Sequence, residues 1–138
     1  MRVMGFLEPD AADHRLIEAA REVLRRNYHP DRHQVGAAVL SGSGKVYAAV
    51  NVEAVGYGPC AEPIAIGMAI SASERVVRAI VAVGKEGDDY PVVSPCGNCR
   101  QLLVDYAPEA MVVLAVDGRV VKARASELLP GAFLSDFG

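Results

Sequence analysis

All three cysteines of this 138-residue chain fall in two short segments, and each segment has the pattern of a loop that enters a helix. The first is YGPCAEPIAI, with Cys60, and the second is SPCGNCRQLL, with Cys96 and Cys99. Free backbone N–H groups and the positive end of the helix dipole favour anionic groups at a helix N-terminus. We therefore expect stabilised thiolates at all three positions, in a site prepared for a dication.

The first predicted helix covers residues 9–28. Asp10 is suited to cap it, and Asp13 follows three residues later. The apolar residues recur at helical spacing and share one face: Leu16, Ile17, Ala20, Val23 and Leu24. This pattern is typical of an amphipathic helix that covers a sheet.

The remaining segments predict alternating strands and helices. Strands at 35–40 and 45–53 flank a Gly/Ser cluster as a hairpin. Further elements are predicted as a helix at 60–73 that is buried on nearly all sides, a strand at 75–84, a loop at 85–91, a helix at 96–108 stopped by Pro108, strands at 111–116 and 119–123, and a short helix at 125–130. Asp117-Gly118 joins the last two strands and predicts an antiparallel hairpin. The order predicts one α/β domain over 1–138, with five strands covered by helices.

Net charge and hydropathy limit the kinds of partner that we expect this protein to bind. The formal charge of -3 and pI near 5.6 provide no basic field for phosphates, so we expect a small neutral or cationic ligand and no nucleic acid. No apolar run approaches the roughly 20 residues of a membrane-spanning helix, and the N-terminus lacks the apolar core of a signal peptide. We therefore expect a cytoplasmic protein without a membrane partner. Its odd number of cysteines favours metal binding or catalysis over a disulfide framework.

Three thiolates can supply three corners of a tetrahedral Zn²⁺ site, with Cys60, Cys96 and Cys99 as the ligands. The corner left open can hold water, which is typical of a catalytic centre. Glu62 follows Cys60 by two residues, in the first turn of the same helix, and is placed to exchange protons with that water. The spacing therefore predicts a hydrolytic zinc site.

Other functions fit parts of the pattern. Cys96 and Cys99 alone match a dithiol redox pair. A structural zinc protein would need a fourth ligand, for which His14, His29 and His33 are the histidines available. We expect His14 on a solvated helix face and His29 in a loop, and leave His33 open. A binding-only domain with zinc but no turnover would not need Glu62.

The chain resembles the zinc-dependent cytidine deaminase family, and is similar both to the small tetrameric cytidine deaminases and to blasticidin-S deaminase. The family signature of His-or-Cys, any residue and Glu, followed by Pro-Cys-x-x-Cys, is met at Cys60, Glu62, Pro95, Cys96 and Cys99. Further motifs occur in the family's order from about Val35 to Phe133: VGAAVL, NVE, YGPCAE, SPCGNCRQLL and ELLPGAF.

The resemblance implies a three-layer α-β-α fold with a five-stranded mixed sheet and hydrolytic release of ammonia from a cytosine-type aminopyrimidine. Zn²⁺ is the implied cofactor, and Glu62 carries the protons between water and ring. Asn51 and Glu53 are implied to hold sugar hydroxyls, and the backbone around Ala61 and Cys96 to contact the ring. Family members form tetramers in which the active sites are shared between subunits. The resemblance therefore implies a homotetramer, with a homodimer as the alternative. It also implies that Phe133 belongs to the active site of a neighbouring subunit.

The chain also departs from the family pattern. His33 stands where cytidine deaminases usually have a Phe against the pyrimidine, so His33 becomes a candidate substrate contact. Pro63 replaces an arginine that commonly offsets the third thiolate's charge, and Arg100 is our candidate for that role. Asn51 and Glu53 can instead be a turn residue and a solvated carboxylate. Cytidine, blasticidin S, a free base or an aminotriazine all remain possible substrates.

Overall fold

Helix α1 spans Ala11–Asn27 in the computed structural model, which describes residues 6–135 of the chain. The backbone N–H of Asp13 donates to Asp10 Oδ1 at 3.0 Å, and the N–H of Asp10 donates to Asp13 Oδ2 at 2.9 Å. Two N–H groups that a helix start leaves without partners are thereby satisfied. The predicted cap and the predicted apolar face of this helix are both confirmed.

One mixed sheet forms the middle of the molecule. Its strands are β1 (Gly36–Ser41), β2 (Val46–Val50), β3 (Val77–Val83), β4 (Val92–Val93), β5 (Met111–Val116) and β6 (Arg119–Arg124). The order is β2-β1-β3-β5-β6, and β4 pairs with the end of β3. The β3–β5 pair is parallel, whereas β5 and β6 form the predicted antiparallel hairpin.

Within residues 6–135 the sheet has six strands, one more than the five predicted. The additional strand is β4, whose two residues are too short to show a strand period in the sequence. Two strands are also shorter than predicted. The strand predicted at 45–53 ends at Val50, and the strand predicted at 75–84 begins at Val77.

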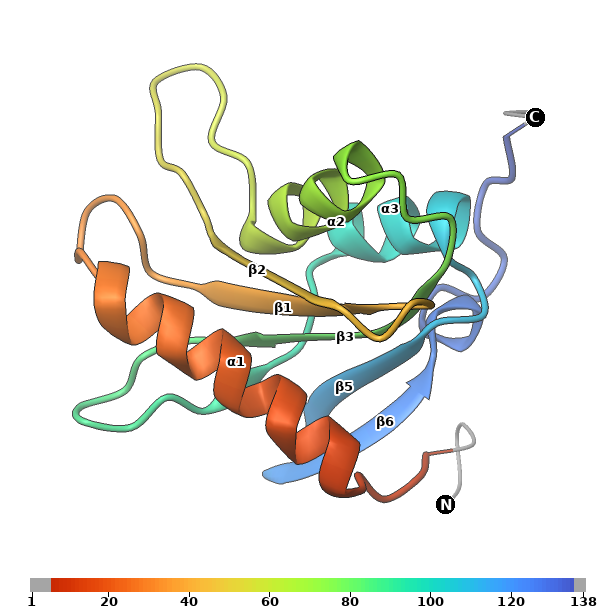
Figure 1. The fold of residues 1–138 in the computed structure, drawn as a ribbon, viewed down its shortest axis with the longest axis horizontal. Coiled ribbons are helices and arrows are strands. Elements are labelled where there is room, and N and C mark those ends of the chain that lie inside the picture. The colour runs from red at the N-terminus through yellow and green to blue at the C-terminus, as the bar shows by residue number, and fades with distance from the viewer. Residues whose placement is uncertain (1–5, 136–138) are drawn as a thin grey trace.

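Helices cover both faces of the sheet. Figure 1 shows α1 across one face, and α2 (Ala61–Ser71) and α3 (Gly97–Tyr106) beside each other on the opposite face. Each face has its own apolar core: Leu16 and Leu24 of α1 pack with Val81 of the sheet, and Ile66 and Leu103 pack with Ile80. The α/β class and the three-layer α-β-α arrangement are confirmed.

Gly36 sets how closely α1 approaches the sheet. A Cβ atom at this position would lie 2.5 Å from the carbonyl oxygen of Ala20 and 2.9 Å from the Cβ of Leu24. Real Cβ atoms do not occupy such positions, so any larger residue would push the helix from β1. The glycine of the VGAAVL motif is therefore a packing residue between two layers.

Helix α2 is less buried than predicted. Ala61, Ala65 and Ala69 face the sheet and are fully buried, but Met68 is 43% and Ile70 45% exposed. The uniformly apolar sequence carries no amphipathic period, so it predicted burial on all sides, whereas only one side packs against the sheet.

The predicted last helix is a single 3₁₀ turn, η1 (Ala125–Leu128).

The segment before α1 lies along the free edge of β6. The backbone N–H of Leu7 donates to the carbonyl oxygen of Lys122 at 2.8 Å, and the N–H of Lys122 donates back at 2.9 Å. Lys122 Nζ also lies 2.8 Å from Asp13 Oδ2, which joins β6 to α1. The expectation that the N-terminal sequence lacks the apolar core of a signal peptide also concerns residues 1–5, which lie outside the described residues. No helix within residues 6–135 is long and apolar enough to cross a membrane.

Candidate metal centre and active site

The three cysteines lie together at the N-termini of two neighbouring helices. Cys60 occupies the N-cap position of α2, Cys96 occupies the N-cap position of α3, and Cys99 lies in the first turn of α3. Cys60 Sγ is 4.0 Å from Cys96 Sγ, and Cys96 Sγ is 3.6 Å from Cys99 Sγ. Two segments that are far apart in the sequence thus supply one cluster.

The sulfur positions fit a tetrahedral zinc site. With Zn–S bonds of about 2.3 Å, two sulfurs on a tetrahedral zinc lie about 3.8 Å apart. The three Sγ atoms lie within 4.8 Å of one another, and among the described residues this cluster contains no histidine or carboxylate ligand. His14, His29 and His33 therefore do not complete a closed structural site in this chain.

The thiols differ in their ease of ionisation. Burial raises the pKa of Cys60 and of Cys99, and the charge of Glu62 raises the Cys99 pKa further. Burial also opposes ionisation of Cys96, but hydrogen bonds from the backbone N–H groups of Cys99 and Asn98 contribute to a net lowering of its pKa. The expectation of three stabilised thiolates was therefore wrong for Cys60 and Cys99. These two need a bound cation to be held as thiolates.

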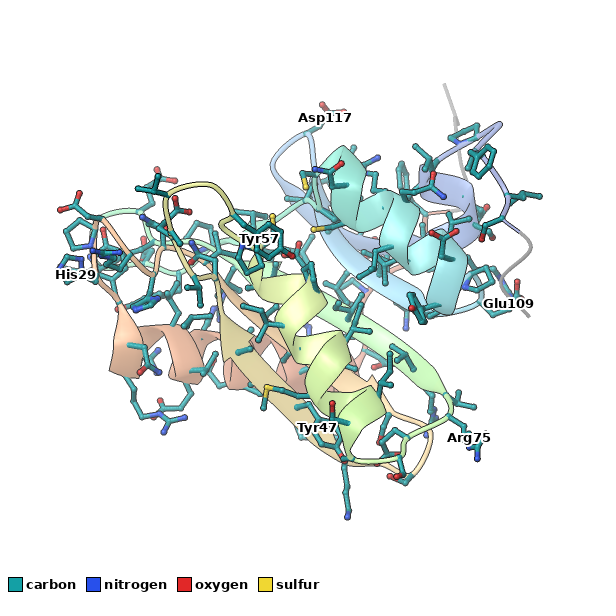
Figure 2. The ribbon with its side chains drawn as sticks, turned by 90° about the horizontal axis from the view of Figure 1, so that it is seen from above. His29, Tyr47, Tyr57, Arg75, Glu109 and Asp117 are labelled. Carbon is teal, nitrogen blue, oxygen red and sulfur yellow. The ribbon has the colours of Figure 1, made fainter. Side chains whose placement is uncertain are left out.

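Glu62 lies in the first turn of α2 and is only 5% exposed. Burial raises the pKa of its carboxyl group. It lines a cavity of about 260 Å³ together with Cys60 and Cys96. The other lining residues are Gln34, Val35, Asn51, Glu53, Gly58, Pro59, Ala61, Val93 and Ser94. The loop over residues 51–60 passes this end of α2 and carries Tyr57, which is labelled in Figure 2 and is 74% exposed.

Asn51 and Glu53, the residues that the resemblance implied as sugar contacts, both line this cavity. Asn51 is 6% exposed, and its Nδ2 donates to Glu53 Oε1 at 3.2 Å. Its Oδ1 accepts hydrogen bonds from the backbone N–H groups of Gln34 and Val35 at 2.7 and 2.9 Å. Asn51 is thus more than a turn residue, because it fixes the entry to β1 beside Glu53.

Two predicted substrate contacts lie elsewhere within the described chain. His33 Nδ1 lies 2.8 Å from the carbonyl oxygen of Asn51, and His33 is not among the residues that line the cavity. Phe133 is 76% exposed, and its carbonyl oxygen accepts a hydrogen bond from Gln101 Nε2 at 2.9 Å. Their roles toward a substrate stay predictions, and that of Phe133 concerns a second subunit.

Within the described residues, Arg100 forms no hydrogen bond with a cysteine side chain and instead donates to two backbone carbonyl groups. Its Nε donates to the oxygen of Pro95 at 2.9 Å, and its Nη1 donates to the oxygen of Leu128 at 3.0 Å. The guanidinium therefore ties the residue before Cys96 to η1. Its compensation of thiolate charge remains a prediction.

The sequence-based prediction missed Gln34, Val93 and Ser94 as cavity residues. Gln34 sits between His33 and the VGAAVL motif, so its place beside a candidate contact was the available signal. Ser94 directly precedes the PCGNC turn, and its Oγ donates to the carbonyl oxygen of Ala115 at 2.8 Å. Val93 belongs to the short strand β4.

Comparisons with known proteins agree with this site. Residues 10–115 match the family model described as the cytidine and deoxycytidylate deaminase zinc-binding region. The chain is 41% identical over 125 residues to a blasticidin-S deaminase of Bacillus cereus, covering 86% of this chain and 89% of that protein. It is 39% identical over 126 residues to a cytidine deaminase of Halalkalibacterium halodurans, covering 88% and 93%.

A solved structure agrees as well. The cytidine deaminase of Burkholderia pseudomallei aligns with a TM-score of 0.72 at 38% identity, over 87% of this chain and 98% of that one. A three-layer fold with a thiol cluster and a buried glutamate at paired helix N-termini defines a zinc-dependent hydrolytic deaminase. This chain belongs to the cytidine and deoxycytidylate deaminase family, and its cofactor is Zn²⁺.

Proposed function

We propose that this protein removes the amino group of a cytosine-type ring carried on a sugar or sugar-like group, giving the uracil-type product and ammonia. One observation carries the proposal. The three Sγ atoms, all within 4.8 Å of one another, adjoin the cavity into which Glu62 is buried. Two of the three candidate ligands, Cys60 and Cys96, thus line the same cavity as the proton carrier Glu62.

The residues of this chain then have distinct tasks. Cys60, Cys96 and Cys99 would hold Zn²⁺. When bound, this ion would lower the pKa of a water molecule so that the water can lose a proton and act as a nucleophile. Glu62 would accept a proton from that water and deliver protons to the ring nitrogen and to the departing amine. Its burial raises its pKa, which favours a carboxyl group that can hold a proton during the reaction.

Glu53 supports a substrate that carries a sugar. It lines the same cavity as Glu62, and a carboxylate is a strong acceptor for hydroxyl groups. Cytidine and blasticidin S are the two candidates that the relatives' names suggest, and the 41% and 39% identities do not separate them. The second candidate function is deamination of a free nucleobase or of an aminotriazine.

A redox function for Cys96 and Cys99 has less support. Cys60 Sγ lies 4.0 Å from Cys96 Sγ, nearly as close as Cys99 Sγ at 3.6 Å. A dithiol pair has no need of a third thiol at this distance, whereas a zinc site uses all three.

An ammonia-release assay on the zinc-loaded protein tests the proposal. Cytidine, blasticidin S, cytosine and an aminotriazine would be compared, with Glu62→Gln as the matched inactive control. We expect turnover of at least one glycosylated substrate at a rate above that of cytosine. Ammonia from no substrate would refute the deaminase function, and a faster rate with cytosine or the triazine would move the protein to the second candidate.

We further propose a cytoplasmic homotetramer in which Phe133 of one subunit approaches a neighbour's cavity. Phe133 and Leu134 are 76% and 75% exposed within one chain, which leaves them free to contact another subunit. Sedimentation velocity would give the subunit number, and a dimer or monomer would contradict this assembly.

A further inference from the structure

The segment from Tyr90 to Cys96 is held near both ends by arginine side chains from different layers of the fold. Arg21 of α1 donates through Nε to the carbonyl oxygen of Tyr90 at 2.9 Å. Arg100 of α3 donates through Nε to the carbonyl oxygen of Pro95 at 2.9 Å. Figure 1 shows α1 and α3 on opposite faces of the sheet. The segment is therefore fixed from both sides of the sheet.

This segment carries part of the cavity wall. Val93, Ser94 and Cys96 line the cavity of about 260 Å³, and Cys96 is also a candidate zinc ligand. Arg21 and Tyr90 are not among the lining residues. Any effect of Arg21 on the cavity therefore passes along β4.

The strand β4 has few other attachments. It pairs with β3 over two residues, whereas strands usually have about three to ten. Pro91 and Pro95 flank it and have no backbone N–H to donate. The carbonyl oxygen of Pro91 accepts from the N–H of Gly84 at 2.9 Å. A strand this short depends on the bonds at its ends, and the bond from Arg21 is one of them.

The two ends of the segment are anchored unequally. At the cysteine end, the side chains of Ser94 and Arg100 both donate to backbone carbonyl oxygens. At the other end, Arg21 is the one side chain within residues 6–135 that donates to the Tyr90 carbonyl oxygen. Without Arg21, we expect β4 to shift while the cysteine end stays in place. The cavity wall should then change more than the zinc site.

The other contacts of Arg21 and of its neighbour Arg25 are ordinary for a helix surface. Arg21 Nη1 lies 3.5 Å from Glu18 Oε2, and Arg25 Cζ lies 5.1 Å from the centre of the Tyr90 ring. The two arginine side chains are 37% and 46% exposed, so their ion pairs contribute little. The bond to the Tyr90 carbonyl oxygen differs, because its acceptor lies 69 residues further along the chain.

We propose that Arg21 is a positioning residue for the substrate cavity. Its bond to the Tyr90 carbonyl oxygen holds β4 so that Val93 keeps its place in the cavity wall. Arg21 acts through β4 and not on the substrate, because α1 lies on the face of the sheet opposite to the cysteine-bearing helices. This inference rests on the proposed deaminase function for its kinetic test.

The kinetic test compares kcat and KM for the best substrate in wild type, Arg21→Ala and Arg25→Ala. A displaced wall weakens binding of substrate and transition state alike, which raises KM and leaves kcat unchanged. For Arg21→Ala we expect KM to rise about tenfold, the low end of what a methylene-sized change in an apolar pocket costs, with zinc content unchanged.

Arg25→Ala is the matched control. It removes an arginine from the same helix and beside the same tyrosine ring, but it leaves the bond to the Tyr90 carbonyl oxygen intact. Its KM should stay within about twofold of the wild-type value.

Hydrogen exchange at the N–H of Gly84 gives a measurement that needs no ligand. This N–H donates to the carbonyl oxygen of Pro91, next to Tyr90. A loosened β4 should therefore exchange it at least about tenfold faster in Arg21→Ala, and Arg25→Ala should leave the rate unchanged.

Binding measured without turnover separates the two proposals. Calorimetry would compare cytidine and blasticidin S on zinc-loaded Glu62→Gln, with and without Arg21→Ala. Weaker binding with Arg21→Ala but no wild-type turnover would refute the deaminase function and support the role of Arg21. Wild-type turnover with KM unchanged in Arg21→Ala, whether or not Gly84 exchanges faster, would overturn the role of Arg21 alone. Loss of zinc in Arg21→Ala, or an equal rise of KM in Arg25→Ala, would also overturn it. Failure of both ligands to bind, with no turnover of any substrate, would overturn both proposals.

Discussion

Arg100 Nε donates a hydrogen bond to the carbonyl oxygen of Pro95 at 2.9 Å, so the residue after Cys99 holds the residue before Cys96. A second bond from Nη1 to the oxygen of Leu128 fixes the guanidinium against η1. Pro95 is buried, and its carbonyl group points to this partner rather than to solvent. The turn that presents Cys96 and Cys99 therefore depends on the shape of the Arg100 side chain as well as on its charge.

Replacing Arg100 should weaken zinc retention. We expect Arg100→Ala to lower zinc affinity by about tenfold or more, because residues that support metal ligands typically contribute 10–100-fold. Arg100→Lys keeps the charge but cannot reproduce the planar fork, so it separates charge from positioning. Competition with a chelator would measure the affinity. Wild-type affinity in Arg100→Ala would assign charge compensation to backbone N–H groups alone.

The metal content follows from the thiol cluster. Purified protein made with zinc present should carry about one zinc per chain, and Cys99→Ser should lose most of it. Removing the metal should lower the melting temperature, because binding to the folded state alone stabilises that state. Elemental analysis and thermal denaturation would check both. A metal-free protein with a Cys96–Cys99 disulfide would instead support the redox function.

Glu62 should be needed for turnover but not for the metal. Glu62→Gln keeps the size of the side chain and removes its ability to carry protons, so kcat should fall by about 10²–10⁴-fold with zinc content unchanged. Ammonia release and elemental analysis of the same sample would be compared. A near-normal rate would show that another group moves the protons.

Gly36 should be intolerant of even one added methyl group. A Cβ would lie 2.5 Å from the oxygen of Ala20, so we expect Gly36→Ala to cost about 1–3 kcal/mol of unfolding free energy. Gly67→Ala in α2 is the matched control, since a Cβ there meets nothing within 4 Å and should stabilise the helix by about 1 kcal/mol. Chemical denaturation would measure both. Equal effects of the two substitutions would contradict the packing role.

Glu74 should contribute a stabilisation that acid removes. Ser43 Oγ and the Tyr47 hydroxyl donate to its Oε2 at 2.7 and 2.9 Å, and chiefly the Ser43 bond lowers the Glu74 pKa below 4.5. A lowered folded-state pKa gives stability that is present above pH 4.5 and lost as the pH falls through the folded pKa. Wild type should therefore exceed Glu74→Gln in unfolding midpoint near neutral pH, and the difference should shrink below pH 4.5. A constant difference would argue against this linkage.

Local sequence patterns predicted the elements whose causes are local. The Asp10 and Asp13 cap lies within one turn, and the hairpin turn needs only Asp117 and Gly118, whose φ angles are 50° and 75°. The cysteine spacing likewise predicted a cluster at two helix starts. In each case, the residues that determine the feature are neighbours in the chain or carry distinctive chemistry.

Features that depend on distant contacts were not predictable in this way. The exposed side of α2 depends on which side meets the sheet, and its apolar sequence does not encode that choice. The bond between Gln34 and Asn51 joins two polar residues whose types are common in loops. The hydrogen bond from Arg100 to Leu128 could not be predicted either, because Leu128 lies in a different element.

The pairing of Leu7 with Lys122 also bears on aggregation. An edge strand with free N–H and C=O groups can template pairing with another chain. On β6 the N–H and C=O of Lys122 are both taken by Leu7, and the N–H of Arg124 donates to Glu127 Oε1 at 3.2 Å. Another molecule could extend the sheet here only by displacing both partners. The segment before α1 therefore shortens the part of the β6 edge to which another chain could pair.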